Sequence, residues 1–425
     1  MSARASDISL PTQRVKEFFL ARQPILDRDE GLVAYELLFR SAEVGPANVT
    51  DDLYATASVI SHAAELGIEN VIGASRGFIN VDASVIMSDI VRFLPKDRVV
   101  LEILETVKAT DDLVMRVREL AEAGYVFALD DVIADSSDIK KLLPFVDIIK
   151  LDIGGMVDLE LKALSARFKS EDKKLLAEKV ENSAQFQTCL ELGFDYFQGY
   201  YFARPDVLTG QKLSPSQMVI MKLMAEVASD AELEDIEHSI KRDASLSFTL
   251  LRLVNSRSST TTHRIDSIGQ ALNVLGRSRL QRWLQILLYA KPGKSNSAAS
   301  PLLVLATTRG KLLELMAEKI QPGNRTMADI GFTVGIMSLM DTLFGLPMFK
   351  IIDQIKVAED VKAALLFREG VFGDMLTLVE HVENIKEAGS LPVALLKKLR
   401  LSSDQFYALQ LAAFEWSDTV SRTTA

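Results

Sequence analysis

Short apolar runs recur along the first half of the chain and predict β-strands. They are Phe18–Ile25, Val33–Phe39, Phe78–Val81, Val99–Leu104, Val126–Leu129, Ile148–Leu151, Leu175–Ala177 and Tyr196–Phe197. From residue 78 onward, each run begins about 20 to 28 residues after the previous one, which is the spacing of a strand followed by a helix. The five residues Asp27–Gly31 predict a hairpin or tight turn between the first two runs. Residues 15–206 are therefore expected to form an α/β TIM-like barrel with an antiparallel first strand.

Amphipathic stretches between these runs predict helices, such as 53–66, ended by Gly67, and Asp112–Ala123, ended by Gly124. After Pro205 the apolar residues recur only at helical spacing. Pro215 follows Ser214 as the first residue of a helix, and Ser267–Leu275 ends at Gly276. This pattern predicts an all-α domain over residues 214–415. We also expect a disordered N-terminus over 1–14, a linker over 207–213 and a flexible C-terminus over 416–425.

Polar residues lie in or just after the apolar runs of the first half, where a core strand has no packing reason to carry them. They are Glu36, Asn80, Glu102, Asp130, Asp131, Lys150 and Glu178. The carboxyl ends of parallel strands converge on one rim of a closed barrel. Carboxylates with an asparagine and a lysine there predict a site for Mg²⁺ or Mn²⁺ and a phosphate. For any single residue, a helix cap or a salt bridge is the simpler interpretation, but it does not explain the whole set.

Composition narrows the class of protein. A chain of 425 residues with 48% apolar and 25% charged residues is typical of a soluble protein of two or three domains. The net charge of −10 argues against a large nucleic-acid surface, and the single cysteine, Cys189, excludes a disulfide framework. Met1–Gln13 is polar, and the longest apolar stretches, such as Gly331–Leu339, are shorter than the roughly 20 residues that span a bilayer. We therefore expect a cytoplasmic protein without a membrane partner.

The polar residues belong to motifs that resemble the EAL domain family, cyclic di-GMP phosphodiesterases with a TIM-like barrel. The motifs are Gln23-Pro24-Ile25, Glu36-Leu37-Leu38-Phe39-Arg40, Phe78-Ile79-Asn80-Val81, Glu102-Ile103-Leu104-Glu105, Leu129-Asp130-Asp131, Lys150-Leu151-Asp152, Ala177-Glu178-Lys179-Val180-Glu181 and Gln198-Gly199-Tyr200-Tyr201, with Pro205. They keep the family's order over roughly residues 15–206, so the resemblance is highly specific.

The resemblance implies a role for each motif. The implied ligands of Mg²⁺ or Mn²⁺ are Glu36, Asn80, Glu102, Asp130 and Glu178, with Asp131 beside a second metal. Lys150 is implied to lie by the attacking water, together with Glu178 and with Glu105 and Glu181 as supporting carboxylates. The residues implied to hold cyclic di-GMP are Gln23, Leu38, Arg40 and Gln198. Glutamine amides can hydrogen-bond a base edge, and an arginine fork can grip a phosphate.

The chain also departs from the family's pattern. After the paired aspartates the family has Phe-Gly and a loop rich in Gly and Ser, whereas this chain has Val132–Ser137, a loop without glycine. Lys179 stands where a glycine is expected, and Leu104 stands where a threonine is expected. The family's Gly- and Ser-rich loop is thought to couple dimerisation to metal binding. Its replacement by Val132–Ser137 therefore lowers the turnover that we expect. Changes around metal ligands commonly cost about one or two orders of magnitude in affinity or activity.

The helical half resembles the HDOD domain, an all-helical relative of metal-dependent HD phosphohydrolases, over roughly residues 213–410. The resemblance is carried by Asp243–Ser256 and Ile265–Gly276. An HD enzyme needs adjacent His and Asp, but none of the four histidines is followed by Asp, and Gly335–Gly345 is nearly all apolar. We expect this half to bind a protein partner or a second copy of the chain rather than to act as an enzyme. Arg252, Arg277, Arg279 and Arg282 near Trp283 could meet an acidic partner or a nucleic acid, but a solvated helix face is the simpler interpretation.

Three functions remain open at this point. The first is a bacterial signalling enzyme that hydrolyses cyclic di-GMP to pGpG by two-metal catalysis, with low or residual activity. The second is a catalytically inactive cyclic di-GMP sensor whose HDOD domain relays occupancy to a partner. The third is a protein-interaction scaffold.

Overall fold

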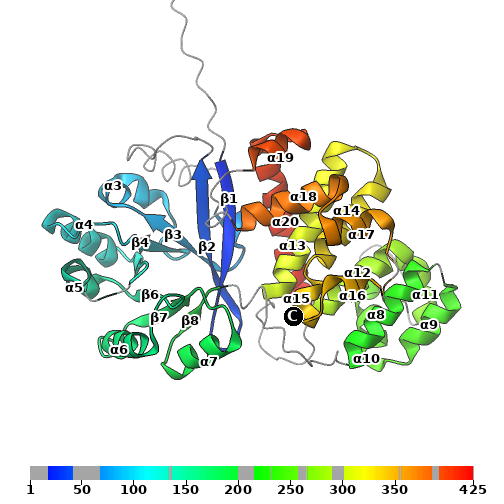
Figure 1. Cartoon of the computed structure of the whole chain (residues 1–425), viewed down its shortest axis with the longest axis horizontal. Helices are drawn as coiled ribbons and strands as arrows, with labels where there is room; N and C mark the ends of the chain where they lie inside the picture. Colours follow the sequence, from blue (N-terminus) through cyan, green and yellow to red (C-terminus); the bar gives the residue numbers. More distant parts are fainter. Residues whose placement is uncertain are drawn as a thin grey trace, which may run out of the picture.

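The two halves of the chain form a barrel and a helical domain that lie side by side (Figure 1). The computed structural model describes residues 18–41, 68–132, 134, 136–199, 215–229, 231–256, 265, 267–289, 301–353, 355, 357–384 and 392–424. The expected helix over 53–66, the disordered N-terminus 1–14 and the linker 207–213 lie outside these residues.

Eight strands close into one barrel in chain order. They are β1 (Phe18–Leu26), β2 (Leu32–Ser41), β3 (Arg76–Val81), β4 (Val99–Ile103), β5 (Val126–Leu129), β6 (Ile148–Asp152), β7 (Lys174–Glu178) and β8 (Tyr196–Phe197). β1 pairs antiparallel with β2 and β8, whereas every other neighbouring pair is parallel. The predicted barrel with an antiparallel first strand is confirmed.

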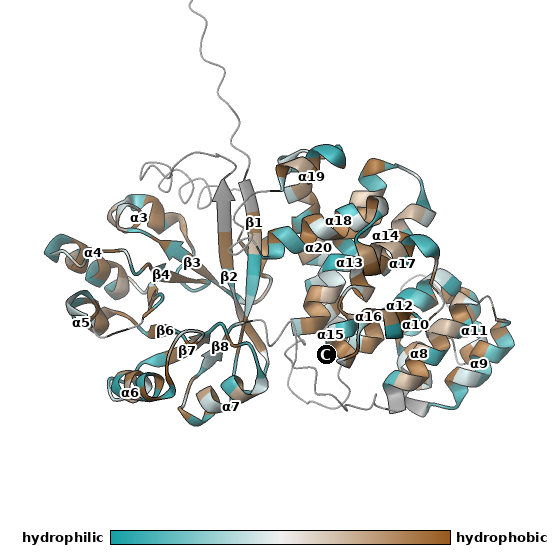
Figure 2. Cartoon of the chain, viewed as in Figure 1, coloured by the Kyte–Doolittle hydropathy of each residue, from teal (hydrophilic) through white to brown (hydrophobic). Residues whose placement is uncertain are grey.

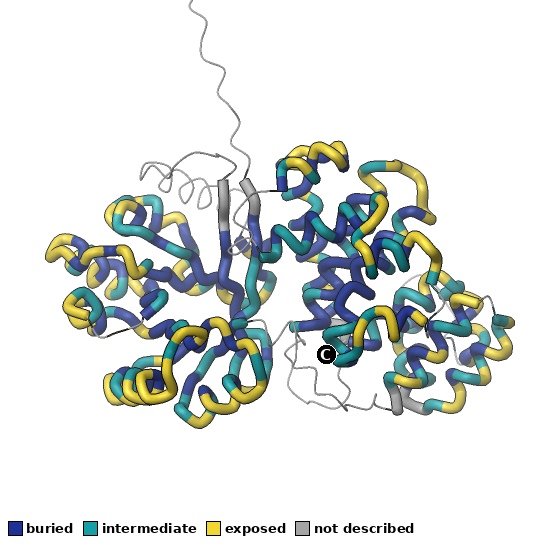
Figure 3. The backbone as a smooth tube through the Cα atoms, viewed as in Figure 1, coloured by how far each residue is buried: buried dark blue, intermediate teal, exposed yellow. Residues whose placement is uncertain are grey.

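Short helices surround the barrel strands. They are α2 (Glu69–Ile72), α3 (Ala83–Met87), η1 (Asp89–Phe93), α4 (Asp111–Glu122), α5 (Ser137–Leu142), η2 (Leu143–Phe145), α6 (Asp158–Lys169) and α7 (Ser183–Glu191). Thr110 and Asn182 begin α4 and α7 by accepting a hydrogen bond from a backbone N–H of the first turn. Hydrophilic residues dominate the outer surfaces of these helices and also occur in β1 and β3 (Figure 2). The outer sides of the helices are largely exposed, while most strand residues are buried, with β1 partly intermediate (Figure 3). The helices cover the outer surface of the barrel, whereas the carboxyl ends of the strands stay uncovered by them and carry polar side chains.

The second half is helical throughout its described residues. Its helices are α8 (Pro215–Ala228), α9 (Leu233–Lys241), α10 (Ala244–Ser256), α11 (Ile268–Leu275), α12 (Arg277–Tyr289), α13 (Pro301–Ile320), α14 (Arg325–Met337), α15 (Met340–Phe344), α16 (Met348–Ile352), α17 (Glu359–Phe367), α18 (Gly370–Glu383), α19 (Val393–Lys398) and α20 (Ser403–Thr424). Ser267 caps α11, and Gly276 ends it with a φ of 73°, which confirms both predicted ends of that helix.

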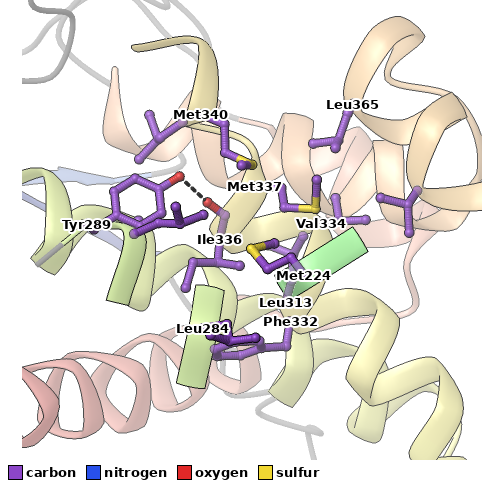
Figure 4. Packing of buried hydrophobic residues seen from close by; sticks show 14 of the residues in the cluster. Met224, Leu284, Tyr289, Leu313, Phe332, Val334, Ile336, Met337, Met340 and Leu365 are labelled. Carbon is purple, nitrogen blue, oxygen red and sulfur yellow. Dashed lines mark hydrogen bonds between the residues drawn. The ribbon is translucent and has the colours of Figure 1, made fainter. Parts of the chain in front are cut away.

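The core of the helical domain is built around α13 and α14 (Figure 4). Gly335 allows the two helices to approach closely, because a Cβ at this position would lie 2.4 Å from the carbonyl oxygen of Arg309. The buried hydroxyl of Tyr289 donates a 2.6 Å hydrogen bond to the carbonyl of Ile336. The segment Arg325–Phe344 has the length and mean hydropathy (1.3) of a membrane-spanning helix, but 61% of its most apolar window is buried. It is divided between α14 and α15, as expected of core helices.

Helix α20 joins the two domains by lying against β1 and α2 of the barrel. Gln410 of α20 donates a 3.2 Å hydrogen bond to the carbonyl of Leu20. The guanidinium of Arg22 lies 3.8 Å from the ring centre of Phe414 and 3.6 Å from a carboxylate oxygen of Asp418. Because α20 continues to Thr424 and Ser417 is fully buried, the expected flexible C-terminus over 416–425 is wrong for residues 416–424. Contacts with strand β1, more than 370 residues away in sequence, keep this end helical.

Candidate functional site

Four carboxylates on or next to four strands converge on one lysine inside the barrel. Glu36 comes from β2, Glu102 from β4, Glu178 from β7, and Asp130 directly follows β5. Lys150 of β6 lies at their centre, and its ammonium is fully buried. We call these five residues the inner cluster. The barrel strands thus bring five of the seven predicted rim residues together, with Glu36 and Lys150 in the middle of their strands and the others at or next to strand ends.

The ammonium of Lys150 makes direct ion pairs with three of the four carboxylates. Its Nζ lies 2.6 Å from Asp130 Oδ1, 2.7 Å from Glu102 Oε1 and 3.0 Å from Glu178 Oε1. A carboxylate oxygen of Glu36 is farther away, at 3.9 Å. One cation therefore faces four carboxylates in a space with almost no solvent.

This imbalance perturbs the ionisation of the inner cluster. Burial raises the pKa of Glu102 well above its usual range, the ammonium of Lys150 opposes that shift, and the Glu36 and Asp130 carboxylates add to it. Burial lowers the pKa of Lys150, but the carboxylates around it outweigh burial and hold that pKa well above its ordinary value. The lysine is thus a permanent cation, and the remaining negative charge favours a further cation.

Three amide side chains extend the inner cluster toward β1, β3 and β8. Gln198 follows β8 and donates hydrogen bonds to Glu36 Oε2 at 2.6 Å and to Gln23 Oε1 at 2.8 Å. Asn80 of β3 donates to Glu36 Oε1 at 3.4 Å. Gln23 and Glu36 face each other across the β1–β2 pair. The two glutamines expected at the nucleotide therefore lie beside a carboxylate expected at the metal.

Several buried acceptor atoms of this set have no hydrogen-bond donor among the described residues. They are Glu102 Oε2, Asn80 Oδ1 and Gln198 Oε1. A buried polar atom without a partner costs about 1–3 kcal/mol. Oxygen atoms of carboxylates and amides are the ligands that Mg²⁺ and Mn²⁺ prefer. The residues present therefore fit a divalent cation.

A second group of carboxylates lies at the outer side of the inner cluster. Glu105, Asp130 and Asp131 place one oxygen each within 4.8 Å of one another. Asp131 has a φ of 45°, in the left-handed region that is costly for residues with a Cβ. We call Glu105, Asp130 and Asp131 the outer cluster. Backbone strain of this kind concentrates at functional sites.

Lys179 and Asp152 border this side of the site, and their pairing with each other is the feature that the sequence prediction did not include. Lys179 follows Glu178 with a φ of 56°, and its ammonium forms an ion pair with a carboxylate oxygen of Asp152. The backbone of Gly199 packs tightly against this turn, because a Cβ at Gly199 would lie 2.3 Å from the backbone nitrogen of Val180. The signal in the sequence was a lysine at a strand end where a glycine was expected.

The other predicted site residues lie outside these clusters. Glu181 is exposed, and its backbone N–H donates to the side chain of Gln185. Leu38 is 5% exposed and packs, with Ala21, in the apolar cluster that includes the core of the helical domain. Arg40 lies on β2 opposite Phe19, and its side chain is outside the described residues. The role of Glu181 as a supporting carboxylate and the roles of Leu38 and Arg40 toward the nucleotide stay predictions.

Two of the four arginines singled out in the helical half, Arg277 and Arg282, make internal contacts, whereas Arg252 and Arg279 are exposed. Arg282 forms two hydrogen bonds to the carboxylate of Glu314, at 2.7 and 2.6 Å, and lies 3.7 Å from the ring centre of Phe332. Arg277 donates to the carbonyl of Ala231. His238 lies on α9 and His381 on α18, while His62 and His263 lie outside the described residues.

Comparison with known families agrees with both parts of this architecture. Residues 8–205 match the EAL domain family, and residues 213–321 match the HDOD domain family. The chain belongs to the EAL domain family, with an HDOD domain after the barrel.

Two curated relatives extend over nearly the whole chain. The cyclic di-GMP phosphodiesterase CdgJ of Vibrio cholerae is 33% identical over 387 residues, which cover 88% of each chain. The uncharacterized protein YuxH of Bacillus subtilis is 31% identical over 410 residues, covering 94% of this chain and 97% of that protein. Among solved structures, an EAL domain protein from Listeria monocytogenes is 23% identical and covers 44% of this chain and 87% of its own, with a TM-score of 0.37.

Proposed function

We propose that the barrel binds cyclic di-GMP together with Mg²⁺ or Mn²⁺ and hydrolyses it to pGpG at a low rate. The observation that carries this proposal is the convergence of four carboxylates from four strands on one buried point. The relative CdgJ is named a cyclic di-GMP phosphodiesterase, and its similarity to this chain covers 88% of each protein.

In this proposal the carboxylates and Asn80 would hold Mg²⁺ or Mn²⁺, which when bound would activate water and neutralise the phosphate charge. Lys150 keeps a positive charge among the carboxylates and can turn toward a phosphate oxygen or the attacking water. Gln23 and Gln198 lie beside Glu36 and can present amide groups to a guanine edge. Arg40, on the same strand as Glu36, is the residue that we propose for a phosphate.

The helical domain is proposed as the output module of the same protein, which binds a protein partner or a second copy of the chain. An HD enzyme would need adjacent His and Asp, and residues 335–345, where that pair would be expected, do not contain it. Its internally paired arginines support a protein partner over a nucleic acid. We propose a cytoplasmic location for both domains.

A second candidate function is a cyclic di-GMP sensor without turnover. It is favoured by the ion pair of Lys179 with Asp152, which places an additional cation beside the ligands. The two candidates differ in product formation and share ligand binding.

The test is an incubation of the full chain with cyclic di-GMP and Mg²⁺ or Mn²⁺, with pGpG followed by chromatography. We expect metal-dependent product that falls at least about a hundredfold in Glu36→Gln, as is typical when a residue acting directly on the reaction is lost. Glu119→Gln on the outer helix α4 is the matched control and should keep the wild-type rate. Titration calorimetry with the nucleotide accompanies the assay. Tight binding without pGpG would select the sensor, and absence of binding would reject both.

A further inference from the structure

We propose that Lys179 takes the place of one divalent cation, so that the site binds a single divalent cation rather than two. This inference rests on the proposed function, because it concerns the metal content of the same site. It assigns to Lys179 the positive charge on the outer side, next to Asp131, and leaves the inner residues to hold the one divalent cation.

The first observation is the backbone of Lys179. Its φ of 56° lies in the left-handed region, where glycine or asparagine is accommodated far more easily than lysine. The turn cannot relax freely, because Val180 donates a 3.0 Å hydrogen bond to the carbonyl of Gln198 and packs against Gly199. The lysine therefore occupies a backbone conformation that the surrounding contacts impose on it and that glycine would adopt at lower cost.

The second observation is that the contacts of Lys179 within the protein are weak compensation. Its ammonium pairs with Asp152, but the side chain is 63% exposed, and ion pairs that are open to solvent contribute little. Asp152 is itself held in place, because its second carboxylate oxygen accepts a 2.9 Å hydrogen bond from the backbone of Gly154. The pair thus places the ammonium on the rim beside Asp152, while most of the lysine side chain stays accessible to a ligand.

The third observation is the charge that surrounds this ammonium. The ammonium of Lys179 forms an ion pair with Asp152, and the carboxylates of Asp131 and Glu178 lie close enough to act on its charge. Asp131 belongs to the outer cluster with Glu105 and Asp130, whose oxygens lie within 4.8 Å of one another. A fixed positive charge next to these carboxylates offsets part of their charge and repels a divalent cation. The same charge attracts the phosphate of an anionic nucleotide.

The test is the number of Mn²⁺ ions bound to the full chain at equilibrium, measured by calorimetry and by the loss of the electron paramagnetic resonance signal of free Mn²⁺. We expect one ion per wild-type chain. Lys179→Asn and Lys179→Gly remove the charge at a position whose backbone both residues accept, and we expect two ions per chain. The second ion should bind at least about tenfold more tightly than to wild type, equal to about 1.4 kcal/mol.

Two further variants separate charge from backbone. Lys179→Arg keeps the charge and the strained backbone and should retain a stoichiometry of one. Lys169→Asn removes another lysine that is paired with an aspartate, at 2.8 Å from Asp195, and should also leave the stoichiometry at one. A gain in Lys179→Gly but not in Lys179→Asn would assign the effect to the backbone and overturn the inference.

The outcomes also separate this inference from the proposed function. Two Mn²⁺ ions in wild type, with no change in Lys179→Asn, would overturn the role of Lys179 and leave the proposed function standing. Binding of neither Mn²⁺ nor cyclic di-GMP to any variant would overturn both.

Discussion

The barrel and the helical domain each bury a cluster of charged side chains, and the two clusters are balanced differently. In the helical domain Arg309 forms hydrogen bonds to Glu383 at 2.5 to 3.0 Å and to Ser338 at 3.0 Å. Glu380 lies 3.6 Å from Arg309 and is held by Arg368 through two hydrogen bonds, at 3.0 and 2.9 Å. Two arginines therefore face two carboxylates there. In the inner cluster of the barrel one lysine faces four carboxylates.

This difference separates a cluster that serves the fold from one that is incomplete without a ligand. Buried charges stabilise a protein only when nearly every partner atom is satisfied. The arginine cluster meets that condition, whereas Glu102 Oε2 and Asn80 Oδ1 have no donor among the described residues. The comparison teaches that the balance of charge, more than its burial, identifies the functional site.

Removing the cation of the inner cluster should have the largest effect. Lys150→Met leaves four buried carboxylates without compensation, so we expect a loss near the upper end of about 3–5 kcal/mol in the free energy of unfolding. Because the carboxylates then lack any cation, Mn²⁺ should restore most of the loss. Urea unfolding with EDTA and with Mn²⁺ measures both. If Lys150→Met does not fold in EDTA but folds with Mn²⁺, that result also shows that a metal cation can replace the lysine. If Mn²⁺ has no effect on its stability, the inner cluster does not differ from the arginine cluster in this respect.

Removing the cation of the arginine cluster should cost slightly less. Arg309→Met leaves Glu383, whose pKa burial already raises, without its hydrogen-bond donor. We expect a loss of about 3 kcal/mol in the same urea experiment. The variant Arg309→Met with Glu383→Leu should recover much of that loss, since a well-packed apolar pair can replace a buried ion pair. Recovery of Arg309→Met by Mn²⁺ would show that the two clusters do not differ in kind.

Arg22, a buried cation between the two domains, gives a third case to compare with the two clusters. Aromatic rings as well as a carboxylate surround its guanidinium. Arg22 lies 4.3 Å from the ring centre of Tyr35 and 3.8 Å from that of Phe414, and donates a 2.7 Å hydrogen bond to the carbonyl of Val71. Arg22→Gln should cost about 2 kcal/mol, without a response to Mn²⁺. Lys141→Gln, at an exposed pair with Asp111, is the control and should stay within about 0.5 kcal/mol. Equal effects in both variants would contradict the role given to burial.

The smallest effect is a change in pH dependence. The pKa of Glu102 is raised in the folded state above its ordinary value of 4.5, so the folded protein binds more protons than the unfolded chain above that pH. Stability must then fall as pH rises from about 4.5 through the folded-state pKa. Glu102→Gln removes this contribution and should raise the free energy of unfolding at pH 8, with little change below pH 4.5. Thermal or urea unfolding across this range in EDTA tests it, and a steeper fall in the variant would refute it.

The sequence predicted the barrel closely because each strand carries its own local signal. The runs Val126–Leu129 and Tyr196–Phe197 coincide with β5 and β8, and Pro215 begins α8 as expected. The convergence of Glu36, Glu102, Asp130 and Glu178 followed from topology, since parallel strands that close into a barrel bring their carboxyl ends together.

The remaining features depend on contacts between residues far apart in the chain. The sequence placed Lys150 on the same rim as the carboxylates, but no local signal shows that Lys179 pairs with Asp152, 27 residues before it. The C-terminus over 416–425 was expected to be flexible, but α20 continues to Thr424, and Ser417 is buried against Thr307 and Val304 of α13. Leu38 was expected at the nucleotide on resemblance alone, but the structure places it in an apolar cluster.

The contact between α20 and β1 also has a consequence for folding during synthesis. Gln410 and Leu20, which meet there, are 390 residues apart in sequence. At ribosomal rates of about 5–20 residues per second, β1 waits roughly 20 to 80 seconds for its covering helix. During that interval the outer side of β1 and the ring of Tyr35 are open to other chains and to chaperones. A nascent barrel should therefore be most vulnerable to aggregation before α20 has left the ribosome.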